Sequence, residues 1–415
     1  MNYIERYLTR PLVESLGDTP VVLLNGARQT GKSTLVHQLA RQKHPARYLT
    51  FDDPGAFSAA KNDPPGFIAG FDEPVILDEV QRVPELFPAI KIEVDRNRRP
   101  GRFLLTGSAD VMLLPQLSES LTGRVEIHTL WPLSPGEINS STGNFIDMTF
   151  ADRFKLPPSQ ELAKDEAIAL VSRGGYPEVL GRRAPHRHRA WFDAYITTIL
   201  QRDVRDIANI EDLTALPRLL ALLSARTASL VNYAEISRST GIPQSTLKRY
   251  LALLEMTFLY QPLPAWNRNL SQRIVKSPKI ILTDTGLLVH LLGFSEGKFF
   301  NDPDRFGPLF ENYIVMELRK QSTWSQTRPR IFHFRTAKGR EVDILLEDQT
   351  GKVVGVEVKA SAKVDVGDFR GLKFLADTLG PAFRRGIVLY LGQEAIPFGQ
   401  DLLALPISAL WASHP

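Results

Sequence analysis

The sequence contains no cysteine among its 415 residues. This absence excludes a disulfide framework, a thiolate metal site, an iron–sulfur cluster and a catalytic cysteine. The sequence also lacks any run of about 18 apolar residues, the length that a helix needs to cross a bilayer, so we expect no membrane partner. Residues 1–6 do not show the basic and then apolar segments of a secretory signal. We therefore expect a cytoplasmic protein.

A strong net charge is missing as well. The chain has 50 Lys and Arg against 46 Asp and Glu, which gives a formal net charge of +4. This small excess favours an anionic partner but does not predict nucleic-acid binding by itself. Apolar residues make up 43% and charged residues 23%, which is typical of globular proteins. At about 150 residues per domain, the length predicts roughly three domains.

The pattern of short apolar runs divides the chain. Runs beginning at Val21, Tyr48, Val75 and Phe103 alternate with helical stretches, which predicts a parallel α/β sheet with helices on both faces. A later segment rich in Ser, Thr, Asn and Pro is typical of a linker, and helical and then β-like patterns follow it. We place an α/β domain at 1–138, a linker at 139–165, a helical domain at 166–275 and a second α/β domain at 276–415.

A glycine-rich loop follows the first apolar run and leads into a helical stretch. Residues 26–33 read G-x-x-x-x-G-K-S. Glycines let successive backbone N–H groups point at phosphate oxygens, and the new helix adds its positive end. Lys32 would reach the β- and γ-phosphates, and Ser33 would bind Mg²⁺. A chance glycine-rich turn is disfavoured by the strand–loop–helix context. The predicted nucleotide-binding residues are Gly26, Ala27, Arg28, Gln29, Thr30, Gly31, Lys32, Ser33 and Thr34.

Two further apolar runs end in residues suited to nucleotide hydrolysis. The run from Val75 stops at Asp78 and Glu79, where Asp78 would hold Mg²⁺ and Glu79 would act as general base. The run from Phe103 stops at hydroxyl residues, and either Thr106 or Ser108 could orient the attacking water or sense the γ-phosphate. A simple polar turn at the end of each strand is the alternative.

These three elements, in this order, resemble the AAA+ type of P-loop ATPase. The segments 121–124 and 173–178, L-T-G-R and R-G-G-Y-P-E, narrow the resemblance to a prokaryotic family that joins an AAA domain to a C-terminal DUF4143 region. The resemblance covers nearly the whole chain and implies ATP and Mg²⁺ as cofactors. It also implies an arginine that neutralises charge on the transferred phosphoryl group. Arg124 is our candidate, with Arg28 as its competitor; a role across a subunit boundary would require a homo-oligomer.

Residues 230–251 predict a helix-turn-helix. Asn232 can cap the first helix, Gly241 marks the turn, and Pro243 suits the first position of the second helix. The second helix would expose residue types that reach base edges and phosphates. These residues are Gln244, Ser245, Lys248 and Arg249. The segment resembles a winged-helix module, for which DNA contact and a purely structural use are the two alternatives.

Two apolar runs near the C-terminus, 340–346 and 353–359, predict a β-hairpin. Alternate residues of a strand share a face, so Glu357 and Lys359 would project together and Asp343 could join them. Both carboxylates could bind Mg²⁺, and the lysine could activate water for phosphodiester hydrolysis. Glu311 offers a further acid.

This arrangement resembles the D…E-x-K core of restriction-endonuclease-like nucleases, although Val342 stands where the fuller signature has proline. An exposed polar strand face, or an inactive fold kept as a binding module, are the alternatives. We therefore predict a Mg²⁺-dependent ATPase that couples its nucleotide state to a DNA- or RNA-related C-terminal module, with nuclease activity left open. The alternative is a nucleotide-gated switch that binds protein partners and carries an inactive nuclease-like domain. The sequence does not distinguish ATP from GTP.

Overall fold

The computed structural model describes residues 3–108, 121–141, 143–154, 156, 162–204, 214–269, 273, 276–293 and 303–412. The chain divides into two compact units. The first contains Met1–Leu133, Tyr176–Glu178 and Leu253–Leu259, and the second contains Ser134–Gly175, Val179–Ala252 and Tyr260–Pro415. In the part of the chain that the structure describes, every helix is too short or too polar to cross a membrane.

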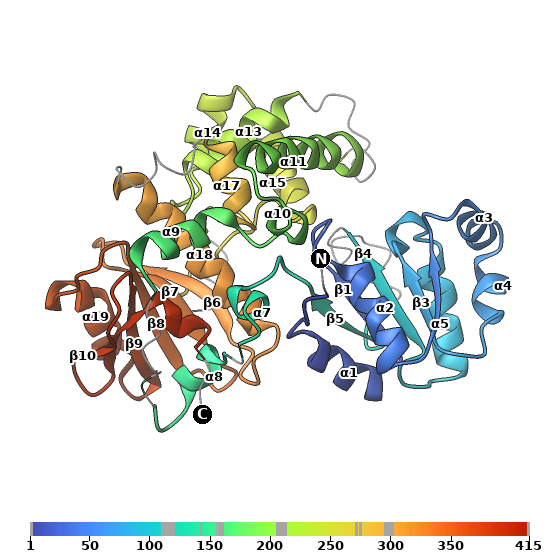
Figure 1. Cartoon of the computed structure of the whole chain (residues 1–415), viewed down its shortest axis with the longest axis horizontal. Helices are drawn as coiled ribbons and strands as arrows, with labels where there is room; N and C mark the ends of the chain where they lie inside the picture. Colours follow the sequence, from blue (N-terminus) through green and yellow to red (C-terminus); the bar gives the residue numbers. More distant parts are fainter. Residues whose placement is uncertain are drawn as a thin grey trace. The chain divides into compact units, whose positions relative to one another are not determined.

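The first unit is built on a five-stranded parallel sheet (Figure 1). Its strands are β1 (Val21–Asn25), β2 (Arg47–Thr50), β3 (Val75–Asp78), β4 (Phe103–Gly107) and β5 (Val125–Thr129), in the spatial order β2-β3-β4-β1-β5. The four apolar runs read from the sequence are confirmed as β1 to β4. Because every pair is parallel, the carboxyl ends of the strands meet at one edge of the sheet.

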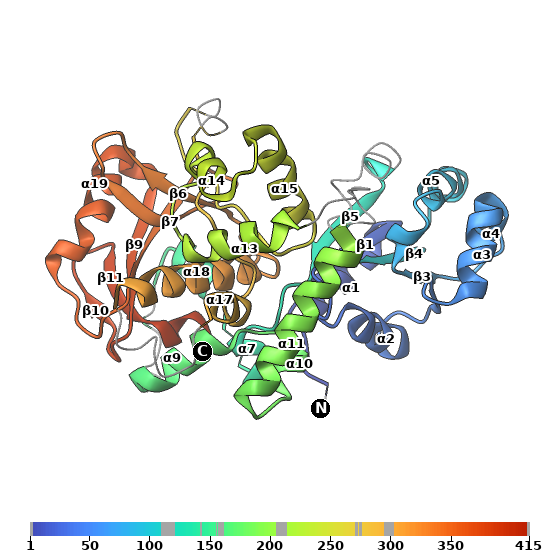
Figure 2. The same cartoon turned by 90° about the horizontal axis from the view of Figure 1, so that it is seen from above.

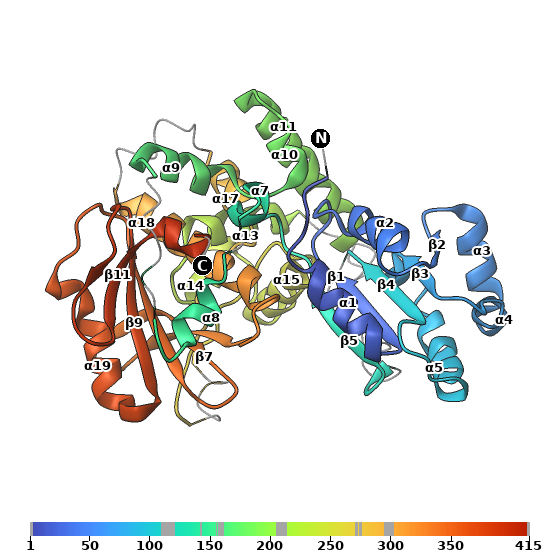
Figure 3. The same cartoon turned by 60° about the horizontal axis from the view of Figure 1, so that its bottom comes forward.

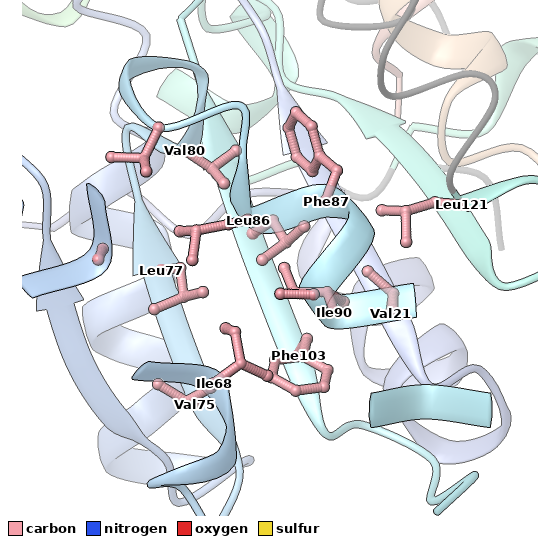
Figure 4. Close-up of a cluster of buried hydrophobic side chains, with 14 of the residues drawn as sticks. Val21, Ile68, Val75, Leu77, Val80, Leu86, Phe87, Ile90, Phe103 and Leu121 are labelled. Carbon is pink, nitrogen blue, oxygen red and sulfur yellow. The ribbon is translucent and has the colours of Figure 1, made fainter. Parts of the chain in front are cut away.

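Helices cover both faces of this sheet, as predicted (Figure 3). Alternate residues of β1 point to opposite faces. Val22 and Leu24 pack with α1 (Thr9–Asp18) and α2 (Lys32–Gln42). The other face packs against three helices and includes the residues drawn in Figure 4, such as Leu77, Leu86 and Phe103. These helices are α3 (Pro54–Asn62), α4 (Pro64–Ala69) and α5 (Leu86–Arg96).

The second unit contains a six-stranded mixed sheet. Its strands are β6 (Arg330–Arg335), β7 (Glu341–Glu347), β8 (Val353–Lys359), β9 (Phe383–Tyr390), β10 (Ile396–Pro397) and β11 (Leu402–Pro406), in the order β10-β11-β9-β8-β7-β6. The predicted hairpin is confirmed as the antiparallel pair β7 and β8. Helix α18 (Pro303–Ser322) contacts β6 and β8, and α19 (Arg370–Leu379) contacts β7, β8 and β9.

Further helices belong to the second unit; Figure 2 shows α13 beside α14. They are α7 (Pro135–Ile138), α9 (Lys164–Arg173), α11 (Pro185–Thr198), α13 (Ala215–Ala225), α14 (Tyr233–Thr240) and α17 (Thr285–Leu291). Helices α10 (Pro177–Leu180) and α15 (Gln244–Met256) are divided between the two units. A π-helical turn, Ile199–Asp203, follows α11. Isolated bridges join Leu230 and Leu263 to Lys279, and Tyr260 to Leu282.

The segment predicted as a linker, 139–165, differs from that expectation in its first half. Residues Phe145–Phe150 form α8, and Phe145 and Ile146 are fully buried. Helix α8 contacts α18 and β9, and the Asp147 carboxylate accepts the backbone N–H of Thr327 at 2.8 Å. One apolar pair inside a polar stretch is enough to anchor the segment on the second sheet. Residues 157–161 lie outside the described part of the chain.

Candidate nucleotide site and C-terminal carboxylate cluster

The glycine-rich loop joins β1 to α2 at the carboxyl edge of the first sheet. Gly26 has φ = 146°, and a Cβ placed there would lie 2.3 Å from the carbonyl oxygen of Leu130, so the position requires glycine. Gly31 has φ = 93° and precedes the first residue of α2, Lys32. The buried Lys32 ammonium donates to the carbonyl oxygens of Gly26 and Ala27, each at 2.9 Å. The loop thus curls around the lysine that the motif predicts.

Arg6 is a residue of this site that sequence reasoning missed. Its guanidinium, 6% exposed, donates to the carbonyl oxygen of Thr30 at 2.8 Å and to that of Trp131 at 2.6 Å. These bonds tie the phosphate loop to the segment that follows β5. Every residue has a backbone carbonyl, so such contacts leave no pattern in the sequence.

Asp78 ends β3 and is buried. Its carboxylate accepts hydrogen bonds from the hydroxyls of Ser33 at 2.9 Å and Tyr48 at 2.6 Å, and from that of Thr106. Burial and the neighbouring Asp78 raise the pKa of the Tyr48 phenol, which therefore stays a donor at neutral pH. Tyr48 comes from β2, and its ring packs against His37 at an angle of 33° with centroids 3.9 Å apart. Tyr48 was not anticipated from the sequence.

Glu79 follows directly and has a left-handed backbone, with φ = 61°. Its N–H donates to Thr106 Oγ1 at 3.2 Å, and its carboxylate accepts from Ser108 Oγ at 3.0 Å and from the Gln81 amide. The predicted Ser33, Asp78, Glu79, Thr106 and Ser108 are thus brought together by hydrogen bonds. An ionised carboxylate beside a hydroxyl is a donor set that suits Mg²⁺, so Ser33 and Asp78 fit the cation that the nucleotide would bring.

Within a single chain, Arg124 lies at the amino edge of the first sheet, which is the edge opposite the phosphate loop. It precedes β5, whose first residue pairs with Val21 at the start of β1, whereas the phosphate loop follows the end of β1. Its guanidinium donates to both carboxylate oxygens of Asp95, at 2.6 and 2.9 Å. Arg28, its competitor, is half-buried within the phosphate loop.

The two helices of the predicted helix-turn-helix are α14 and α15. Asn232 Oδ1 accepts the N–H of Glu235 at 3.1 Å, and Gly241 adopts φ = 74° at the turn. Pro243 stands one residue earlier than expected, directly before α15, and its carbonyl accepts the N–H of Leu247 at 2.8 Å. The side chains of the predicted recognition set, Gln244, Ser245, Lys248 and Arg249, are all exposed. The Lys248 ammonium lies 5.7 Å from the ring centroid of Tyr233.

The third constellation is a buried cluster in the second unit. Asp343 on β7 and Glu311 on α18 approach each other around Lys279, whose ammonium lies 2.6 Å from Glu311 Oε1 and 3.3 Å from Asp343 Oδ1. Burial lowers the pKa of Lys279, but the charges of Glu311 and Asp343 outweigh it and raise that pKa overall. Burial and the charge of Asp343 raise the pKa of Glu311 to about 8. Lys279 belongs to no motif, and no local pattern predicted this contact.

Glu357 and Lys359 lie on β8, opposite Asp343. The backbone N–H of Val358 donates to Asp343 Oδ2 at 3.0 Å. Burial, together with the charge of Asp343 and a hydrogen bond to it, raises the pKa of Glu357. Lys359, in contrast, forms an ion pair with Asp368. Among the described residues, no group of three or more His, Asp and Glu is placed to hold a metal ion, so a metal on Asp343 and Glu357 stays a prediction.

The R-G-G segment has a structural explanation. Gly174 adopts φ = 73°, and a Cβ there would lie 2.2 Å from Asp284 Oδ1. The buried Asp284 carboxylate accepts the N–H of Gly175 at 2.7 Å and that of Leu287 at 3.0 Å. This carboxylate caps α17 and fixes the turn after α9, so these residues act in folding.

Three family models match the chain. One described as an AAA domain matches residues 18–139. Two regions described as domains of unknown function follow it, DUF8612 at 164–298 and DUF4143 at 306–410.

Two proteins of similar sequence are described as uncharacterized proteins. The protein Rv2008c of Mycobacterium tuberculosis is 31% identical over 396 residues, which cover 95% of this chain and 82% of that protein. An uncharacterized protein of Haemophilus influenzae is 24% identical over 255 residues, 59% of this chain and 57% of its own length.

Solved structures with a detectable likeness include a Holliday junction branch migration motor and a replication initiator. The Thermotoga maritima RuvB motor is 19% identical, covers 62% of this chain and 89% of its own, and gives a TM-score of 0.28. AMPPCP-bound DnaA from Aquifex aeolicus is 13% identical, covers 60% and 86%, and gives a TM-score of 0.27. At such TM-scores, conclusions about function have to come from the geometry of the sites.

Proposed function

The chain belongs to the family of the uncharacterized mycobacterial proteins, in which an AAA domain precedes a DUF4143 region, and from this membership we propose that it is a Mg²⁺-dependent ATPase. The observation that carries the proposal is the network centred on Asp78. Three hydroxyls, of Ser33, Tyr48 and Thr106, converge on one buried carboxylate directly behind a phosphate loop. Ser33 belongs to the phosphate loop itself, and a hydroxyl of this loop beside an aspartate at a strand end is the pair that holds Mg²⁺ in P-loop nucleotide hydrolases.

The chemistry follows from the positions of the side chains. The loop N–H groups and Lys32 would bind the β- and γ-phosphates, and Ser33 and Asp78 would hold Mg²⁺, which neutralises phosphate charge when bound. Glu79 would accept a proton from the attacking water as the new P–O bond forms and the bond to ADP breaks. Ser108, 3.0 Å from Glu79, and Thr106 are suited to orient that water.

The test separates binding from turnover. Glu79→Gln removes the base and keeps the shape, so we expect ATP affinity within about threefold of wild type and turnover lower by roughly 100-fold or more. Steady-state phosphate release and equilibrium binding of a fluorescent ATP analogue measure the two quantities. Glu85→Gln, the same change at an exposed glutamate directly before α5, is the control. Equal turnover in Glu79→Gln and wild type would remove the general-base assignment.

Arg124 is proposed to act on a neighbouring subunit's nucleotide. Within its own chain the whole length of β1 separates it from the phosphate loop, but the surface pair with Asp95 leaves it at the periphery of the unit. An arginine that acts in this way is worth about 10³-fold or more in turnover. Arg124→Ala should therefore lower turnover while each chain still binds ATP, and the effect should appear only where the chains associate.

The DNA- or RNA-related role rests on the exposed side of α15. Lys248 and Arg249 stand beside Gln244 and Ser245, a set able to contact phosphates and base edges, and the bridges at Leu230, Leu263 and Lys279 are where a wing would be built. Lys248→Ala with Arg249→Ala should weaken DNA binding and reduce its dependence on salt. Unchanged binding would favour a protein partner at this surface.

Nuclease activity at Asp343, Glu357 and Lys359 is the least supported part of the proposal, and a second candidate competes with it. Lys359 pairs with Asp368, and Lys279 neutralises Asp343. These contacts favour the alternative, a nucleotide-gated switch whose C-terminal sheet binds partners and cuts nothing. Incubation of plasmid DNA and of RNA with Mg²⁺ or Mn²⁺, comparing wild type with Lys359→Ala, distinguishes the two.

A further inference from the structure

Lys279 occupies the centre of the carboxylate cluster in the second unit. Its side chain is 8% exposed, those of Glu311 and Asp343 are 15% and 16% exposed, and the ammonium lies within 3.3 Å of both carboxylates. The lysine of the E-x-K pattern, Lys359, forms its ion pair with Asp368 instead. The cation that this cluster holds therefore comes from a segment outside the pattern.

The backbone on both sides fixes Lys279 in this position. Its N–H donates to the carbonyl of Leu263 at 2.9 Å, and its own carbonyl accepts the N–H of Leu263 at 3.0 Å. The residues on either side are held in the same way, because Val231 N–H donates to Pro278 and Ile280 N–H donates to Ser229, each at 2.8 Å. These bonds fix the backbone of Lys279 next to the cluster, and the contacts with Glu311 and Asp343 hold its ammonium there.

Space and charge decide what else the cluster can hold. A divalent ion binds carboxylate oxygen at about 2.0–2.6 Å, and it would have to share Glu311 and Asp343 with an ammonium already in contact with both. Two cations at such a separation repel strongly in a buried site. We propose that Lys279 is the resident cation of this cluster and excludes a divalent metal ion from it in the folded protein.

This inference rests on the proposed metal site at Asp343 and Glu357 and specifies its regulation. Metal entry requires Lys279 to withdraw, and its strand segment also carries hydrogen bonds to Ser229 and Val231, which lie just before Asn232 and α14. A ligand that moved the start of the helix-turn-helix would therefore act on the same segment that closes the cluster. The second unit would accordingly hold no metal at this cluster until its segment 278–282 is displaced.

The experiment counts bound Mn²⁺ on the full-length protein by electron paramagnetic resonance, without nucleotide. Wild type is compared with Lys279→Met, which keeps the side-chain length and removes the charge, and with Lys279→Arg, which keeps the charge. Lys276→Met, at an exposed lysine three positions earlier, is the matched control. Any Mn²⁺ bound at other sites is common to all four proteins and is subtracted.

We expect Lys279→Met to gain a Mn²⁺ site at the cluster, because the competing cation is gone. The affinity of wild type for Mn²⁺ at the cluster should be lower by at least about tenfold. Adding Asp343→Asn should abolish the gain, and Lys279→Arg should behave like wild type. Equal Mn²⁺ binding by wild type and Lys279→Met overturns the proposal, as does a wild-type site that Asp343→Asn alone removes.

Stability in EDTA provides the second readout, because Lys279→Met leaves buried carboxylates without their partner. A melting temperature that falls in EDTA and recovers with Mn²⁺ supports the proposal. A fall that Mn²⁺ does not reverse counts against it. DNA cleavage is a separate matter: a Lys279→Met protein that binds Mn²⁺ and cuts nothing contradicts the nuclease assignment and leaves the role of Lys279 intact.

Discussion

Two buried lysines, Lys32 in the first unit and Lys279 in the second, differ in the groups that surround their ammonium ions. The Lys32 ammonium donates to two backbone carbonyls at 2.9 Å, whereas Lys279 lies 2.6 and 3.3 Å from two carboxylates. Both sets of hydrogen bonds have a charged donor, but only the carboxylates carry a full opposite charge, which attracts the ammonium far more strongly than a carbonyl dipole does. A lysine held by carbonyls can therefore be drawn to a phosphate, whereas a lysine held by carboxylates is already neutralised.

The acidic residues of the two sites also differ in the groups that surround them. Asp78 accepts from hydroxyls, which stabilise an ionised carboxylate and can turn toward a metal ion. Glu311 and Glu357 are buried close to Asp343, and their pKa values are raised. The first site is thus arranged to receive a charged ligand, while the second satisfies its own charges. Similar residue types at the two sites do not make similar sites.

The largest expected effect is that of removing Lys32. Lys32→Ala takes away the cation that would contact the β- and γ-phosphates, so ATP turnover should fall by roughly 100- to 1,000-fold. Steady-state phosphate release measures it. Lys43→Ala, at an exposed lysine just after the same helix, should stay close to wild type. If Lys32→Ala keeps most of its turnover, the proposed contrast between the two lysines is wrong.

Removing Lys279 should act on stability. Lys279→Ala leaves the buried Asp343 carboxylate without its counter-charge, which costs about 3–5 kcal/mol in the free energy of unfolding at neutral pH. Urea denaturation followed by circular dichroism measures this quantity. An exposed ion pair serves as the control, because Arg10→Ala removes only the partner of Glu14 on the surface of α1 and should leave the free energy of unfolding close to that of wild type. A similar loss of unfolding free energy in both variants would show that the buried cluster contributes no more to stability than an exposed ion pair.

The pH dependence of folding stability should also distinguish the two sites. Glu311 has its pKa raised to about 8 in the folded protein, above the ordinary value of 4.5. The folded state therefore binds this proton more tightly than the unfolded state, and the stability that it contributes is present below about pH 4.5 and is lost as the pH rises toward 8. The slope attributable to one such group is at most about 1.4 kcal/mol per pH unit.

Glu311→Gln should remove the contribution of Glu311 to the slope of unfolding free energy against pH between pH 5 and pH 8. Denaturation midpoints of wild type and variant, measured across this range, test the prediction. Parallel curves for the two proteins would mean that Glu311 keeps its ordinary pKa and that the cluster is less buried than described.

The smallest effect concerns Tyr48. Tyr48→Phe removes one hydroxyl from Asp78 and preserves the ring that packs against His37, so the loss should be that of a single hydrogen bond to a charged group, about 1.5–3 kcal/mol. We expect the Mg²⁺ dependence of nucleotide affinity to weaken more than the affinity measured in EDTA. An equal loss with and without Mg²⁺ would place Tyr48 in packing alone.

The sequence allowed the contiguous parts of the first site to be predicted. The phosphate loop and the strand ends at Asp78 and Thr106 follow from runs of neighbouring residues, and the parallel sheet brings them to one edge. Arg6 and Tyr48 could not be predicted, because one binds backbone carbonyls and the other reaches Asp78 from a different strand.

In the second unit the prediction of the hairpin held, but Lys279 was missed. It meets Asp343 from 64 positions earlier in the chain, and no local pattern encodes such a contact. The packing of α8 was missed for a related reason, since two buried residues, Phe145 and Ile146, outweigh the polar composition around them.

Isothermal titration of the purified, folded chain with ATP is the decisive measurement of the proposed nucleotide site. We expect each chain to take up a single ATP, Mg²⁺ to tighten the binding, and Lys32→Ala to abolish the heat. A folded protein that takes up neither ATP nor ADP would show that the loop around Lys32 is not a nucleotide site.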